Sequence, residues 1–102
     1  MIVPSRWAEP FGIVALEGIA TGCALVASSG GGLPDAVGPC GLLFPNGDAA
    51  ALALALKKVL SDEGCRHQII EAGPVHLENF TPGHVASLYL SLFESLISPF
   101  RP

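Results

Sequence analysis

The spacing of hydrophobic positions divides the first half of the chain into short strands and helices. Residues 1–3 (Met-Ile-Val) and 24–28 (Ala-Leu-Val-Ala-Ser) are short apolar runs, typical of strands that are buried on both faces. Between them, residues 12–21 carry apolar side chains at helical spacing and stop at Gly22, a residue type that often ends helices. Residues 40–45 (Cys-Gly-Leu-Leu-Phe-Pro) form another short apolar run. We therefore expect two or three strands, the run at residues 1–3 being at most the end of one, with a helix between the first two.

The second half of the chain shows helical patterns with local start and stop signals. Asp48 precedes the Ala/Leu-rich residues 49–60 and is a suitable N-cap for a helix there. Residues 63–79 are predicted to be helical, with a kink or break at Gly73-Pro74 because proline lacks the backbone N–H. Thr81-Pro82 offers an N-cap and a first-turn proline for a last helix over residues 83–97. The pattern thus predicts a mostly helical second half.

Three consecutive glycines, Gly30, Gly31 and Gly32, follow the second predicted strand. Glycine permits backbone angles that are closed to other residues and lets another group approach the main chain closely. A single helical turn is expected just after them, at residues 35–37 behind Pro34. Considered alone, this loop is a weak indication of function.

Alternation of strands and helices indicates an α/β fold: a partial Rossmann-like parallel sheet flanked by helices. We divide the chain into an α/β part, residues 1–82, and a C-terminal helix and tail, residues 83–102. Two or three strands make a narrow sheet, and a strand at residue 1 suggests a missing upstream segment. An unpaired sheet edge would invite self-association. The last helix should pack on a substantial partner, because it carries a broad apolar stripe: Val85, Leu88, Tyr89, Leu92, Phe93 and Leu96.

Composition narrows the possible functions. The 102 residues are 50% hydrophobic and only 14% charged, against about a quarter charged in ordinary soluble domains. The formal net charge is −4 and the five basic residues form no patch, which argues against nucleic-acid binding.

Three cysteines without a CxxC pair indicate reduced thiols and no zinc site. No secretory leader and no apolar run of about 18 residues is visible. We expect a cytoplasmic protein, with peripheral attachment to a membrane left open.

Two carboxylates, Glu9 and Glu17, flank the apolar run in the stretch EPFGIVALEG. A helix starting near Gly12 would leave the backbone N–H groups of residues 11–14 free to bind an anion. Glu9, in the loop, could accept hydrogen bonds from a polyol. Glu17 lies among apolar neighbours, where an unpaired carboxylate costs several kcal/mol, so a polar partner such as a ribose is expected. The alternative is that Glu9 is a solvated loop residue and Glu17 an exposed point on an amphipathic helix.

The order of these features resembles a known family. Pro4-Ser5 and Glu9-Pro10-Phe11-Gly12 come first, then the E-x7-E spacing of Glu9 and Glu17, GGLPD at residues 31–35 and GLLFPNGD at residues 41–48. This set is similar to the C-terminal, donor-binding domain of retaining glycosyltransferases with the GT-B fold, family 4 ("glycosyl transferases group 1"). The resemblance covers nearly the whole chain.

The resemblance implies a role for each motif residue. It implies a nucleoside-diphosphate sugar as the donor substrate, with no metal ion or other cofactor, and electrostatic stabilisation of the departing diphosphate. Glu9 would be the catalytic and sugar-binding carboxylate. The remaining implied contacts are the amides of Phe11 and Gly12 to the sugar, those of Val14 and Ala15 to the pyrophosphate, Glu17 to the ribose, and Gly30, Gly31 and Gly32 bordering the donor pocket.

The chain departs from the family pattern in two ways. The upstream Arg and Lys that neutralise the diphosphate have no counterpart here, since Arg6 is not at their position, and the acceptor-binding N-terminal domain is absent. We therefore expect a fragment that is inactive alone and needs the missing domain or a partner chain. The alternatives are a non-catalytic nucleotide-binding or interaction module that pairs with a separate chain, and a truncated reading frame.

The remaining polar and aromatic residues favour structural roles. His67, His76 and His84 are dispersed over predicted helices and are interpreted as surface or packing residues. Trp7, in the loop before Glu9, is predicted to be a packing residue and not a platform for stacking a base. The donor base, the sugar and the acceptor are not encoded in any of these motifs.

Overall fold

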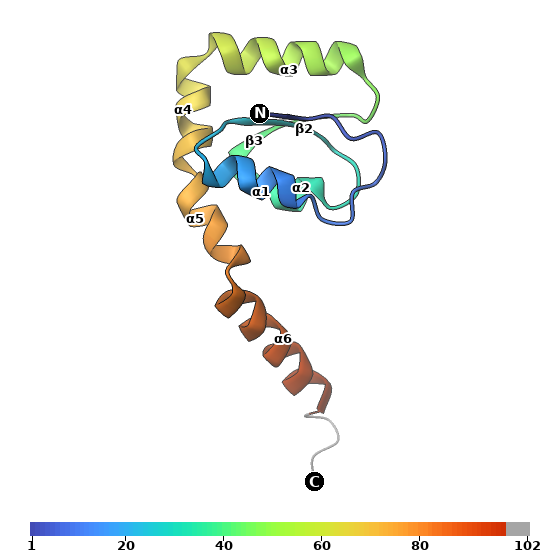
Figure 1. Cartoon of the computed structure of the whole chain (residues 1–102), viewed down its shortest axis with the longest axis vertical. Coiled ribbons are helices and arrows are strands. Elements are labelled where there is room, and N and C mark those ends of the chain that lie inside the picture. The colour runs from blue at the N-terminus through green and yellow to red at the C-terminus, as the bar shows by residue number, and fades with distance from the viewer. Residues whose placement is uncertain (98–102) are drawn as a thin grey trace.

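The computed structural model describes residues 1–97 and contains a parallel sheet between two layers of helices (Figure 1). The strands β1 (Ile2–Val3), β2 (Leu25–Ser28) and β3 (Gly41–Phe44) are ordered β1-β2-β3. Val3 pairs with Ala27, and Leu25 pairs with Gly41. All three predicted runs form strands, and the α/β, Rossmann-like class is thus confirmed.

The helices cover the sheet on both faces (Figure 1). On one face lie α1 (Ile13–Ala20) and α2 (Leu33–Val37), the latter followed by the 3-10 turn η1 (Gly38–Cys40). The other face is covered by α3 (Ala49–Ser61) and α4 (Glu63–Glu71). The chain continues through α5 (Gly73–Leu77), the 3-10 turn η2 (Glu78–Phe80) and α6 (Pro82–Ile97).

The side chains of β2 contribute alternately to the two halves of the core, one on each face of the sheet. Successive side chains of a strand point to opposite faces of the sheet. Leu25 and Ala27 therefore enter the cluster under α1 and α2, whereas Val26 enters the cluster under α3 and α4. Every residue of β2 is buried, which confirms the prediction of a strand buried on both faces.

The predicted helix signals act as expected. The Asp48 carboxylate accepts a hydrogen bond from the Ala51 N–H at 2.9 Å and caps α3. The Thr81 hydroxyl accepts one from the His84 N–H at 3.2 Å at the start of α6, which begins one residue earlier than predicted. The helical stretch 63–79 is split where Gly73-Pro74 begins α5.

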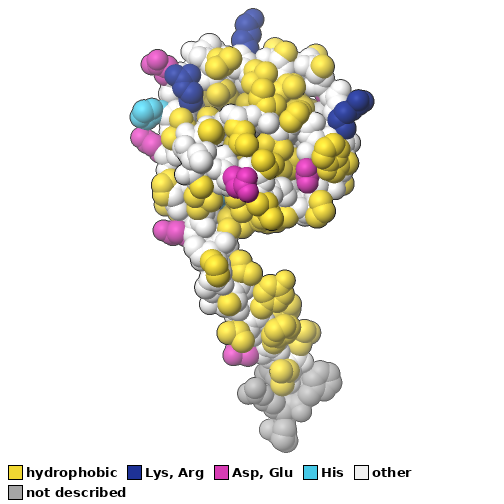
Figure 2. All heavy atoms as spheres, viewed as in Figure 1, with side chains coloured by type: hydrophobic (Ala, Val, Ile, Leu, Met, Phe, Trp, Pro, Cys, Tyr) yellow, Lys and Arg dark blue, Asp and Glu magenta, His cyan; other side chains and the backbone are white. Residues whose placement is uncertain are grey.

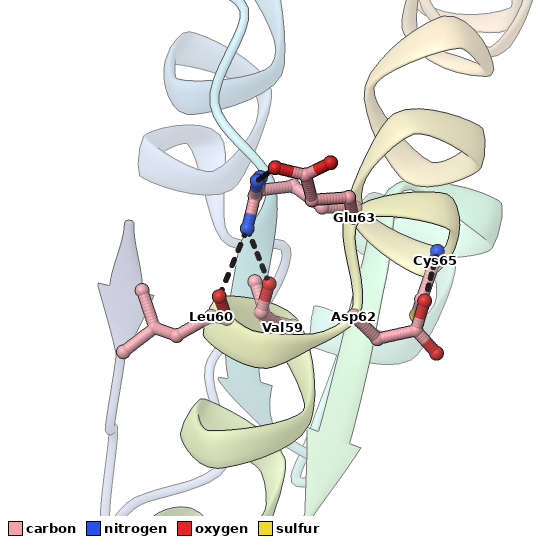
Figure 3. A network of polar contacts seen from close by, with 6 residues as sticks. Val59, Leu60, Asp62, Glu63 and Cys65 are labelled. Atoms are coloured by element: carbon pink, nitrogen blue, oxygen red, sulfur yellow. Dashed lines mark hydrogen bonds and ion pairs between the residues drawn. The ribbon is translucent and has the colours of Figure 1, made fainter.

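A polar corner joins α3 to α4 (Figure 3). Asp62 ends α3 and caps α4, because its carboxylate accepts a hydrogen bond from the Cys65 N–H at 2.9 Å. The Arg66 guanidinium donates to the carbonyl oxygens of Val59 at 2.9 Å and Leu60 at 3.2 Å. These carbonyls belong to the last turn of α3, which has no intrahelical donors for them. Arg66 therefore stabilises the sharp turn between the two helices.

We expect Arg66→Ala to lower the free energy of unfolding by about 1 kcal/mol, because two carbonyl groups lose a partly buried, charged donor. Urea denaturation measures this change. Lys57→Ala is the matched control: it removes the same charge from an exposed position on α3. Equal denaturation midpoints for the two variants would show that the corner bonds contribute nothing to stability.

The last helix, α6, projects away from the α/β body (Figure 1). None of its residues is buried, and its apolar stripe is exposed to solvent (Figure 2). Val85, Leu88, Tyr89 and Leu92 line a shallow groove along it. The apolar stripe led us to expect that α6 packs on a substantial partner. Within residues 1–97, no segment covers the stripe. No helix in this described part is both long and apolar enough to span a membrane.

Candidate functional site

Three loops meet at the carboxyl edge of the sheet, where ligands bind in open parallel α/β sheets. They are residues 4–12 after β1, 29–32 after β2 and 45–48 after β3. The Asn46 amide joins them, because its oxygen accepts from the Gly30 N–H at 3.0 Å and its nitrogen lies 3.5 Å from the Trp7 carbonyl oxygen. Segments that are far apart in sequence thereby form one continuous edge.

The glycine loop packs directly on the segment that carries Glu9. The Gly32 N–H donates to the Glu9 carbonyl at 2.6 Å. Gly31 has a φ of +59°, and a Cβ placed on it would lie only 2.6 Å from the Glu9 backbone nitrogen. A Cβ on Gly32 would lie 2.9 Å from the Phe11 Cα. The close approach predicted for these glycines is therefore made by the protein's own backbone, and their role beside a donor pocket stays a prediction.

The Glu9 side chain is oriented by a buried serine. One carboxylate oxygen of Glu9 accepts a hydrogen bond from the Ser5 hydroxyl at 2.9 Å. Ser5 is only 6% exposed, whereas Glu9 is half-buried, so the carboxylate is held in place while part of it stays open to solvent. Sequence reasoning missed Ser5 and Asn46. The Pro4-Ser5 pair ahead of Glu9 was the available signal for the first, and Asn46-Gly47 resembled an ordinary turn.

The first turn of α1 presents free backbone N–H groups. Its N-cap is Gly12, which has a φ of +93° and no side chain to accept from them. The amides of Ile13 and Val14, the first two helical residues, have no intrahelical acceptor. Both residues are exposed, at 65% and 40%. The Ala15 amide, in contrast, already donates to the Gly12 carbonyl at 3.0 Å and belongs to a fully buried residue, so this geometry does not support a ligand contact there.

Glu17 lies on the outer face of α1. The helix buries Ala15, Gly18 and Ile19 against the sheet, and Glu17 is exposed on another face together with Ile13. The expectation that Glu17 sits in an apolar environment was wrong, because the face of α1 that it shares does not contact the core. Glu17 is exposed, as the alternative predicted, whereas Glu9 is half-buried and hydrogen-bonded to Ser5 and is not the solvated loop residue of that alternative. A ribose-binding role stays a prediction.

The candidate site is an open surface in the described part of the chain. A hollow on the α3 side of the carboxyl edge contains none of the predicted site residues; its lining is Pro4, Arg6, Phe44, Gly47, Asp48, Ala49 and Leu52. Within residues 1–97, no group of three His, Cys, Asp or Glu side chains is arranged to hold a metal ion. The three cysteines are free thiols, and burial raises the pKa of Cys40.

The other residues singled out from the sequence have mixed outcomes. Trp7 is 64% exposed, so its predicted packing role was wrong. His67 and His84 are exposed, and His76 is buried with its Nε2 2.8 Å from the Ala36 carbonyl oxygen. The interpretation of the histidines as surface or packing residues is confirmed.

Comparisons with known proteins agree with this geometry. Residues 1–76 match the family described as "Glycosyl transferases group 1". D-inositol 3-phosphate glycosyltransferase of Corynebacterium urealyticum is 41% identical over 90 residues, which cover 86% of this chain and 21% of that protein. Glycogen synthase of Mycobacterium tuberculosis is 48% identical over 63 residues, 60% of this chain and 15% of that protein.

A solved structure shows the same architecture. Sucrose-phosphate synthase from Thermosynechococcus elongatus superimposes with a TM-score of 0.75 at 36% sequence identity, over 96% of this chain and 25% of that chain. The chain thus spans about a fifth of the length of the curated relatives it matches. With the family match over most of its length and the same α/β architecture, the chain belongs to the glycosyl transferases group 1 family, as part of the GT-B glycosyltransferase fold.

Proposed function

We propose that this chain binds the nucleoside-diphosphate sugar donor of a retaining hexosyltransferase. The observation that carries the proposal is the uncapped, exposed N-terminus of α1 at the carboxyl edge, close along the chain to the oriented Glu9 carboxylate. Anions are stabilised at such a terminus by free N–H groups and by the helix dipole. The names of the relatives, a glycosyltransferase and a glycogen synthase, support the same class of reaction.

Each part of the donor has a matching group on this edge. The amides of Ile13 and Val14 would face the diphosphate, Glu9 would accept hydrogen bonds from sugar hydroxyls, and Glu17 would accept from the two ribose hydroxyls. When the bond between the anomeric carbon and the diphosphate breaks, negative charge grows on the leaving group. A prearranged helix N-terminus stabilises that charge without reorganising at the moment of reaction.

We expect this chain to bind donor without turning it over. The family resemblance assigns the cations that neutralise the diphosphate, and the acceptor, to segments outside these 102 residues. Such a site should bind nucleotide weakly, in the millimolar range, since part of the usual electrostatic attraction is missing.

Titration of the ¹⁵N-labelled chain with UDP, GDP and ADP tests the proposal by nuclear magnetic resonance. Saturable shifts should be largest at the amides of Ile13 and Val14, and the three nucleotides should rank by donor base. Uridine, which lacks the diphosphate, should leave these two amides unshifted. Shifts of equal size across the whole surface, or none at millimolar UDP, would contradict donor binding.

A second candidate function is that of an interaction module that pairs with a separate chain. It is favoured by the exposed stripe of α6 and by β1, which is an edge strand. Exposed apolar patches mark interaction sites in soluble proteins, and open strand edges invite pairing. Light scattering over a range of concentrations, alone and with candidate partners, tests it. A monodisperse monomer under all of these conditions would contradict it.

A further inference from the structure

We propose that Phe80 is a positioning residue for the N-terminal turn of α1. The Phe80 ring lies in an edge-to-face arrangement with that of Phe11, with centroids 5.5 Å apart and planes at 62°. Phe11 directly precedes Gly12, the N-cap of the helix. A side chain in η2, near the end of the α/β body, therefore contacts the segment that leads into the free amides of Ile13 and Val14.

The contact between Phe80 and Phe11 matters because Phe11 lies at the entry of the chain into α1. A hydrophobic residue just ahead of an N-cap often packs against the fourth residue of the same helix and so fixes the direction in which the chain enters the helix. Here the aromatic partner comes from a distant segment. The left-handed backbone of Gly12 offers little stiffness of its own, since glycine adopts many conformations at similar cost. Packing of Phe11 on Phe80 limits the conformations available to residues 9–12.

Phe80 is itself anchored to the body of the fold. Its ring packs edge-to-face on that of His76, with centroids 5.1 Å apart and planes at 69°. The buried His76 imidazole is hydrogen-bonded to the Ala36 carbonyl oxygen at 2.8 Å, which ties α5 to α2. The His76 ring can occupy this position because residue 38 is a glycine: a Cβ there would lie only 2.8 Å from the His76 Nδ1. The series Ala36, His76, Phe80 and Phe11 thus connects α2 to the first turn of α1.

This inference rests on the proposed function only for the identity of the ligand, the nucleotide of the donor, that the turn binds. The positioning itself has a readout without ligand, because two hydrogen-bonded amides report on the same turn. The Ala15 N–H donates to the Gly12 carbonyl at 3.0 Å, and the Gly32 N–H donates to the Glu9 carbonyl at 2.6 Å. If Phe80 holds residues 9–12, both amides should exchange with solvent faster when its ring is removed.

The experiment compares Phe80→Leu, which keeps apolar volume but loses the ring, with Phe80→Tyr, which keeps the ring. We expect Phe80→Leu to speed hydrogen exchange at Ala15 and Gly32 severalfold and to weaken UDP binding about fivefold, a change in line with the strength of an aromatic pair. Phe80→Tyr should keep the wild-type exchange rates at Ala15 and Gly32 and the wild-type affinity for UDP. Ile69→Val, at a buried position of α4, is the control for general destabilisation. It should speed hydrogen exchange at Ala15 and Gly32 no more than at other amides of the core.

Exchange at Ala15 and Gly32 that is the same in Phe80→Leu and the wild-type chain overturns the proposal. So does faster exchange with unchanged UDP affinity, since the turn would then not need positioning. If the wild-type chain fails to bind UDP, donor binding is wrong, and the exchange rates alone decide whether Phe80 orders the turn. Should Phe80→Leu not fold, Phe11→Leu removes the same aromatic pair from the other side and must produce the same local change in exchange.

Discussion

Glu17→Gln should weaken nucleotide binding by about 10- to 100-fold and leave the stability of the chain unchanged. A charged acceptor that bonds two ribose hydroxyls contributes about 1.5–3 kcal/mol, which is the origin of the expected loss. The side chain is exposed on α1 and takes part in no hydrogen bond or ion pair within residues 1–97. Its replacement should therefore change the free energy of unfolding by less than about 0.5 kcal/mol.

The two effects are measured on the same samples, by titration with UDP and by urea denaturation. Glu94→Gln is the matched control, because it removes an equal charge from an exposed position on α6, far along the chain from α1. That variant should bind UDP as the wild-type chain does. Unchanged affinity in Glu17→Gln would show that Glu17 does not bind the ribose. A marked loss of stability would show instead that the carboxylate has a structural role.

The largest effect on stability is expected for Gly31→Ala, which should cost at least about 2 kcal/mol. Two causes add. The φ of +59° is unfavourable for any residue with a Cβ, and the new methyl group would lie 2.6 Å from the Glu9 backbone nitrogen. Relief of this clash requires the glycine loop and the Glu9 segment to separate, which would break the bond from the Gly32 N–H to the Glu9 carbonyl. Nucleotide binding should be lost together with stability.

Gly47→Ala separates the two causes. Gly47 also has a left-handed backbone, with a φ of +77°, but a Cβ there would meet no atom within 4 Å. This control should therefore lose only the conformational part, about 1 kcal/mol. Urea denaturation of both variants gives the comparison. Equal losses would mean that the packing of Gly31 on the Glu9 segment is loose enough to accept a methyl group.

Local signals in the sequence were sufficient for the secondary structure. Helix starts at Asp48 and Thr81 depend on a side chain reaching a backbone N–H three residues away, and the break at Gly73-Pro74 depends on the proline itself. The burial of β2 followed from an apolar run too short to be a helix. These features involve neighbours in sequence, so periodicity and residue type are enough to predict them.

The environment of the site residues, in contrast, depends on contacts between segments distant in sequence. The motif order pointed to Glu9 and Glu17, but it could not show that Ser5 orients the first or that the second faces solvent. It also could not show that Gly31 is required by the backbone of Glu9. Which face of α1 meets the sheet, and which loop lies on which, follows from side-chain volumes and backbone approach across the carboxyl edge, and no single stretch of the chain encodes them.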